Sequence, residues 1–171
     1  MPGSNMSSPQ QIAAIRAAVL AAFDGVQQPP EADIAPHDCE ECAELRAAFA
    51  HTDWRTMSTL VEEYPTGLSL LSSEAYAYFL GAYLLYALDH FTPDALPAEM
   101  LVYNLAPEGS PSDEHEEWHR EKLRHMTREQ MAVVERFLDL VEADAEFGEY
   151  VGDLSTGRAR YRDHWEQRWV S

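Results

Sequence analysis

Apolar residues recur along most of the chain at three- and four-residue intervals, the spacing of one face of an α-helix. The segment 73–89 is apolar almost all round and predicts a helix surrounded by other helices. The segment 128–143 carries a second apolar face made of Met131, Val134, Phe137, Leu138 and Val141. No alternating pattern long enough for a strand occurs. We therefore predict an all-α fold, a compact orthogonal bundle of about six to eight helices around a central apolar helix at about 73–89.

Capping residues mark where several helices begin. Ser8 and Gln11 form a Ser-x-x-Gln capping box around Pro9, and Thr127 with Gln130 forms another. Further helices are expected near 38–49, 55–63, 97–104 and 113–124. We expect 1–7 to be disordered or a cloning remnant, 8–150 to form the helical domain, and 151–171 to form a basic aromatic helix that packs on it.

Charge is distributed unevenly along the 171 residues, whose net charge is −18. Residues 1–119 contain three basic and nineteen acidic residues, a net of −16, whereas 120–171 contain nine basic and eleven acidic residues, a net of −2. An acidic body repels nucleic-acid phosphates and anionic lipids, because both are bound through Lys and Arg. The composition therefore favours a basic protein partner and argues against nucleic acid and membranes, with solubility alone as the alternative explanation.

The sequence also bears on cellular location. Its first residues lack the basic and apolar regions of a secretory signal. The longest apolar run, 75–88, is shorter than the ~20 residues that span a bilayer. We expect a cytoplasmic protein.

The most distinctive motif is His37-x-Cys39-x-x-Cys42, at the start of a predicted helix with Asp38 as its N-cap. One imidazole and two thiols can form three corners of a tetrahedral zinc site, so zinc or another metal is a candidate cofactor. The fourth ligand is not apparent. His51 is the nearest histidine, but a continuous helix would hold it more than ~10 Å away.

Two other interpretations of the cysteines stay open. A redox pair requires a lowered thiol pKa, which a helix N-terminus favours but the neighbouring Asp38, Glu40, Glu41 and Glu44 oppose. No βαβ pattern of a thioredoxin-like fold surrounds the pair. Alternatively, the cysteines are small buried apolar side chains beside a capping histidine.

A second motif, His115-Glu116-x-x-His119, matches the zinc-protease pattern, and His125 lies where a third ligand would follow. That pattern has glycine where this chain has Lys122. Because the segment is highly charged, we interpret it as a solvated helix face. No catalytic arrangement is complete, so the sequence favours a binding role over an enzyme.

Several of these residues together resemble a widespread family of bacterial helical domains without an established activity. The resemblance rests on His37-x-Cys39-x-x-Cys42, on Trp54, on the Leu-Ser-x-Glu-Ala-x-x-Tyr-Phe-Leu block that ends at Leu80, and on the Thr127 and Gln130 pair. It covers roughly 30–143, leaves the basic tail outside, and implies a fold but no mechanism.

The leading hypothesis is an acidic domain that binds and neutralises a basic protein, such as an immunity protein against a bacterial toxin. Its contact residues are expected to be the acidic side chains Asp38, Glu40, Glu41, Glu44, Glu62 and Glu63. The alternatives are a small zinc-binding structural domain and, less favoured, a helical metalloprotease.

Overall fold

The computed structural model describes residues 8–107 and 113–167, without the side chains of 113–115. Within those residues it contains nine α-helices, three short 3-10 helices and no strand, so the all-α prediction is confirmed. The α-helices are α1 (Pro9–Ala22), α2 (Glu40–Phe49), α3 (Ser58–Glu63), α4 (Ser73–Asp89), α5 (Leu96–Leu105), α6 (Asp113–Lys122), α7 (Arg128–Ala143), α8 (Ala145–Val151) and α9 (Ser155–Glu166). The 3-10 helices are η1 (Glu31–Asp33), η2 (Trp54–Thr56) and η3 (Gly67–Leu70). The expected disorder of 1–7 falls outside the described residues.

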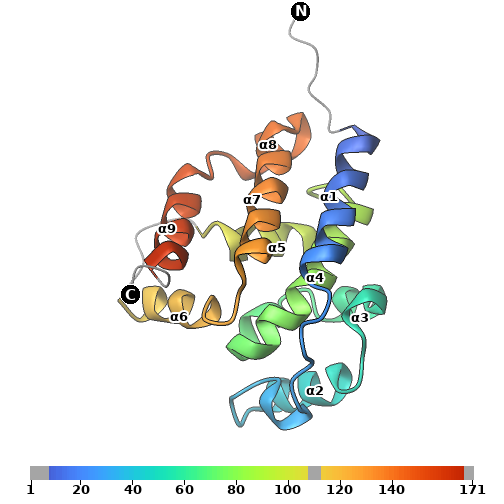
Figure 1. Ribbon diagram of the computed structural model, residues 1–171, viewed down its shortest axis with the longest axis vertical. Helices are drawn as coiled ribbons and strands as arrows, with labels where there is room; N and C mark the ends of the chain where they lie inside the picture. The colour runs from blue at the N-terminus through green and yellow to red at the C-terminus, as the bar shows by residue number, and fades with distance from the viewer. Residues whose placement is uncertain (1–7, 108–112, 168–171) are drawn as a thin grey trace, which may run out of the picture.

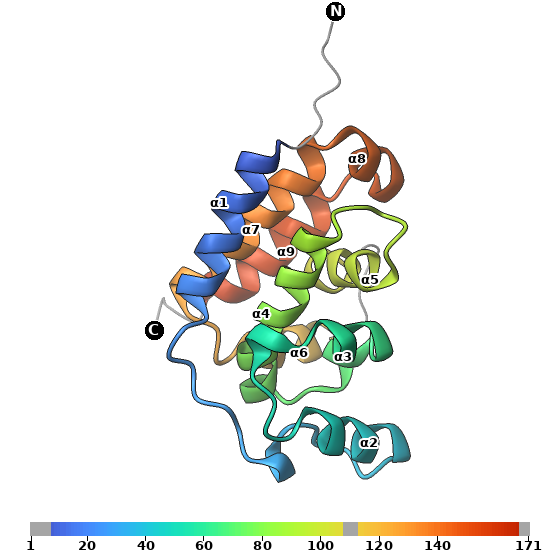
Figure 2. The same cartoon turned by 90° about the vertical axis from the view of Figure 1, so that its right-hand side faces the viewer.

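The central helix is α4, with the bounds that the sequence predicts. Every residue from 75 to 88 is buried, and α1, α3, α5 and α6 all contact this helix (Figures 1 and 2). Its buried tyrosines donate their hydroxyl hydrogens, Tyr76 to Asn104 Oδ1 and Tyr83 to the carbonyl of Tyr64, each at 2.7 Å. Burial on all sides is therefore compatible with the polar ends of these side chains.

Local capping signals start several of the other helices. Both predicted capping boxes are present, at Ser8 for α1 and at Thr127 for α7. The α8 helix was not expected from the sequence. Asp144 caps it by accepting hydrogen bonds from the backbone N–H groups of Glu146 and Phe147, both at 3.1 Å.

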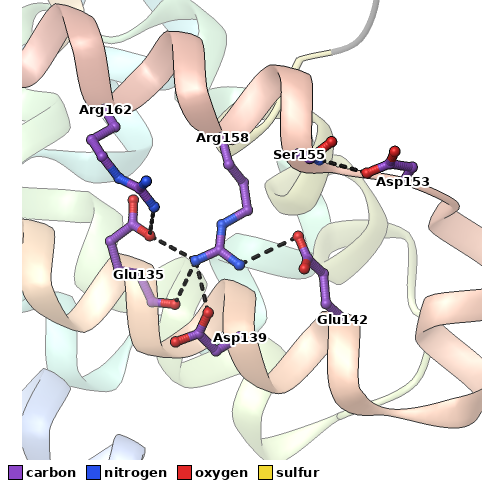
Figure 3. Close-up of polar contacts among 7 residues, drawn as sticks. All are labelled: Glu135, Asp139, Glu142, Asp153, Ser155, Arg158 and Arg162. Atoms are coloured by element: carbon purple, nitrogen blue, oxygen red, sulfur yellow. Dashed lines mark hydrogen bonds and ion pairs between the residues drawn. The ribbon is translucent and has the colours of Figure 1, made fainter.

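The C-terminal helix α9 packs against α5 and α6 and is joined to α7 by ion pairs. Figure 3 shows the guanidinium of Arg158 between three carboxylates of α7: Glu135 at 2.6 Å, Asp139 at 2.8 Å and Glu142 at 3.3 Å. Arg162 also pairs with Glu135, at 2.9 Å. These contacts attach the described part of the basic tail, which ends at 167, to the body of the protein.

Candidate functional site

The candidate site lies at the end of the molecule formed by η1 and α2, which contact each other (Figures 1 and 2). Leu45 and Phe49 face the core and are fully buried. Arg46 donates hydrogen bonds to the carbonyl oxygens of Ala35 at 2.7 Å and His37 at 3.0 Å. The arginine of α2 therefore holds the preceding segment in place, and its hydrogen bonds go to the backbone.

The two cysteines meet at the first turn of α2. Cys39 is exposed and is the N-cap, because its sulfur accepts a hydrogen bond from the backbone N–H of Cys42 at 3.4 Å. Cys42 is fully buried, and its side chain hydrogen-bonds the Cys39 sulfur. The prediction of Asp38 as the N-cap was wrong by one residue, because the thiol of Cys39 occupies the capping position instead.

The two thiols differ in acidity. The hydrogen bonds from the side chain and the backbone of Cys42 lower the pKa of Cys39, although the carboxylate of Glu41 acts in the opposite direction. Burial raises the pKa of Cys42, and the neighbouring Cys39 sulfur raises it further. The accessible thiol is therefore the one that ionises first.

Lys122, at the end of α6, is a buried cation whose charge is coupled to that of Cys42. It is 7% exposed, donates a hydrogen bond to the carbonyl of Leu71, and places its ammonium 5.1 Å from the centre of the Trp118 ring. Burial lowers its pKa to about 8, whereas negative charge on Cys42 would raise it. Nothing in the local sequence of α6 indicated that this lysine is buried.

The expected metal ligands are only partly brought together. Within 8–107 and 113–167, no three His, Cys, Asp or Glu side chains gather as they would around a metal ion. The side chain of His37 is exposed, and the backbone N–H of this residue hydrogen-bonds the Cys42 sulfur. His51 follows the far end of α2, as the rise of a continuous helix requires. Zinc binding stays a prediction from the sequence.

The acidic residues that the sequence nominates are all exposed. We define the acidic surface as the side chains of Asp38, Glu40, Glu41, Glu44, Glu62 and Glu63. Four lie in α2 or just before it, and two end α3; α2 and α3 both lie in the lower half of the molecule in the two views (Figures 1 and 2). Across the described residues none of the six forms an ion pair, although Glu62 accepts a hydrogen bond from Tyr86 at 2.9 Å.

The protease-like motif lies on α6, but the expectation of a solvated face was wrong at two positions. His119 is 3% exposed and its ring makes an edge-to-face contact with Trp118, and Lys122 is buried as well. The side chain of His115 lies outside the described part. His125 lies beyond the end of α6, where its Nδ1 is 3.1 Å from the Ser73 hydroxyl.

The chain belongs to a family of unknown function, DUF6714, whose model matches residues 11–169. This match agrees with the expectation of a family without an assigned activity, and it includes most of the basic tail, which the resemblance had left outside. No curated protein and no solved structure matches the chain significantly. Among the described helices, none has the length and apolar character needed to cross a bilayer.

Proposed function

We propose that this protein is an acidic binding domain that neutralises a basic protein partner, as an immunity protein does with a toxin. The observation that carries the proposal is the acidic surface, whose exposed carboxylates have no cationic partner among the described residues. Uncompensated charge of one sign at one end of a protein creates a local field that attracts an oppositely charged partner.

Some carboxylates elsewhere in the described residues have a counter-charge close by. Asp89 pairs with Arg16 at 2.8 Å, and the carboxylates of α7 surround Arg158. At the η1–α2 end, by contrast, Arg46 is committed to backbone carbonyls. Here six exposed carboxylates in or beside two helices lack an ion pair within the described residues while the nearby arginine is used by the backbone, which supports an interaction role for this end.

The chemistry of the partner follows from the sign and exposure of these groups. Carboxylates attract Lys and Arg side chains, and Arg in particular binds them through paired hydrogen bonds. Complementary charge mainly accelerates association and selects among partners, and it is weakened by salt. An acidic surface can occupy and block the active site of a basic protein that itself binds an anion. A nuclease is one such partner.

The test compares binding by the natural protein with that of a variant in which Glu40, Glu41 and Glu44 are all replaced by Gln. Each protein is immobilised, and extract of the source cells is passed over it in low and high salt. The retained protein is identified by mass spectrometry, purified, and its association rate measured. We expect a basic protein to be retained, with an association rate that falls at least about tenfold in high salt and in the triple variant.

The matched control replaces three exposed carboxylates elsewhere, Glu129, Glu146 and Glu149, by Gln. The control removes the same charge from the protein, and it also removes carboxylates from the first turns of helices, as the test variant does. Equal binding by both variants, or an association rate that salt does not change, would reject the acidic surface as the binding site. Neutralisation is then tested by whether the protein abolishes the toxicity or enzymatic activity of the purified partner.

A further inference from the structure

The first turn of α2 contains a feature that partner binding does not use. Cys39 and Cys42 hydrogen-bond each other, one sulfur is exposed and the other is fully buried. The Cys39 sulfur lies 3.4 Å from the backbone nitrogen of Cys42, so the sulfur that would be bridged is already at the residue that carries its partner. Among the described residues no third His, Cys, Asp or Glu side chain joins the pair.

We infer that Cys39 and Cys42 form a thiol–disulfide exchange site, with Cys39 as the attacking thiol and Cys42 as the resolving thiol. The exposed position at the N-cap gives Cys39 access to an external disulfide, and the backbone N–H of Cys42 points at its sulfur. The N-terminus of a helix favours negative charge, so the same contacts that cap α2 stabilise a Cys39 thiolate. The inference is independent of the proposed binding function.

The reaction needs a disulfide as co-reactant. The Cys39 thiolate attacks one sulfur of that disulfide, which breaks its S–S bond, forms a mixed disulfide and releases a first thiolate. Cys42 then loses its proton to solvent and attacks the Cys39 sulfur, which forms the Cys39–Cys42 disulfide and releases the second thiolate. The two cysteines are oxidised by two electrons, the external disulfide is reduced to two thiols, and each released thiolate takes up a proton.

The experiment uses the reduced full-length protein and oxidised glutathione as the probe disulfide, with mass spectrometry of the intact chain and its peptides. We expect the natural protein to form the Cys39–Cys42 disulfide and to release two glutathione molecules per chain. Cys42→Ser should accumulate a stable mixed disulfide between Cys39 and glutathione. Cys39→Ser should stay reduced at Cys42, and circular dichroism checks that both variants are folded.

A separate measurement on the natural protein does not depend on the variants. Iodoacetamide should modify Cys39 at least about tenfold faster than Cys42 at neutral pH. Three outcomes would overturn the inference: no Cys39–Cys42 disulfide, equal trapping of glutathione on Cys42, or thiols that react only after stoichiometric zinc is removed by a chelator.

Discussion

Lys122 allows the energetic cost of a buried charge in this fold to be measured directly. It is the only lysine of the chain, and its side chain is buried against the Trp118 ring with a hydrogen bond to the Leu71 carbonyl. Burial lowers its pKa from 10.5 to about 8. The folded state therefore releases this proton at a lower pH than the unfolded chain does.

The sign of the pH effect follows from proton binding in the two states. Between the folded and unfolded pKa values of Lys122, the unfolded chain holds more protons, so the free energy of unfolding rises with pH. Below pH 8 both states are charged, and the full cost of the shift, about 3 kcal/mol, is present. About 2 to 3 kcal/mol of it should be regained between about pH 7 and pH 10.

The perturbation is Lys122→Met, which keeps a long flexible side chain beside Trp118 and removes the charge. The lost hydrogen bond to Leu71 costs about 1 kcal/mol. We therefore expect the variant to be more stable than the natural protein by about 2 kcal/mol at neutral pH and to lose this advantage near pH 10. The assay is urea unfolding of both proteins, reduced, followed by far-ultraviolet circular dichroism across this pH range. A stability difference that stays constant with pH, or a natural protein that is more stable at neutral pH, would refute the reasoning.

Three further predictions concern the packing of the bundle, each measured by urea unfolding. Arg158→Leu should lower the free energy of unfolding by at least about 2 kcal/mol, because it leaves three carboxylates of α7 without their shared cation. Arg162→Gln, at a half-exposed position, should lower it by less than about 1 kcal/mol, and equal losses for the two variants would contradict this account. Gly157→Ala should lower the free energy of unfolding by about 1 to 3 kcal/mol, since the added Cβ would lie 2.6 Å from a backbone carbon at the end of α5. An unchanged urea midpoint would show instead that α9 can shift to make room for the methyl group. Gln130→Glu replaces a fully buried amide that donates a hydrogen bond to an α4 carbonyl at 3.0 Å, so the free energy of unfolding should fall by about 2 kcal/mol at neutral pH. This loss should shrink toward pH 5 as the new carboxyl group becomes protonated, and a loss that grows on acidification would contradict the prediction.

The parts of the fold that the sequence predicts best are those that depend on neighbouring residues alone. Ser8 and Thr127 begin their helices through capping boxes closed within four residues. The bounds of α4 follow from Ser72 as the N-cap and from an apolar composition that only a surrounded helix tolerates. In each case the deciding interaction lies inside the segment that carries the signal.

Burial of charged residues could not be predicted in the same way. The α6 segment is rich in charge and lacks an apolar stripe, so a solvated face was the simplest interpretation. His119 and Lys122 are nevertheless buried, because α6 packs on both α4 and α9. Since α9 is held by Arg158 to α7, the environment of Lys122 depends on contacts between segments that are distant in sequence.

The acidity of Cys39 shows why the same limitation affects the candidate site. From the sequence, the acidic residues around the motif argue against a reactive thiol. In the structure the contacts that lower the pKa of Cys39 come from Cys42, whose side chain and backbone hydrogen-bond its sulfur directly. Glu41 does raise this pKa, but it acts through charge alone at an exposed position, where water and salt weaken the interaction. A count of neighbouring charges treats these effects as equal, whereas direct hydrogen bonds outweigh the screened charge. The acidic surface and a reactive thiol can therefore occupy the same turn of α2.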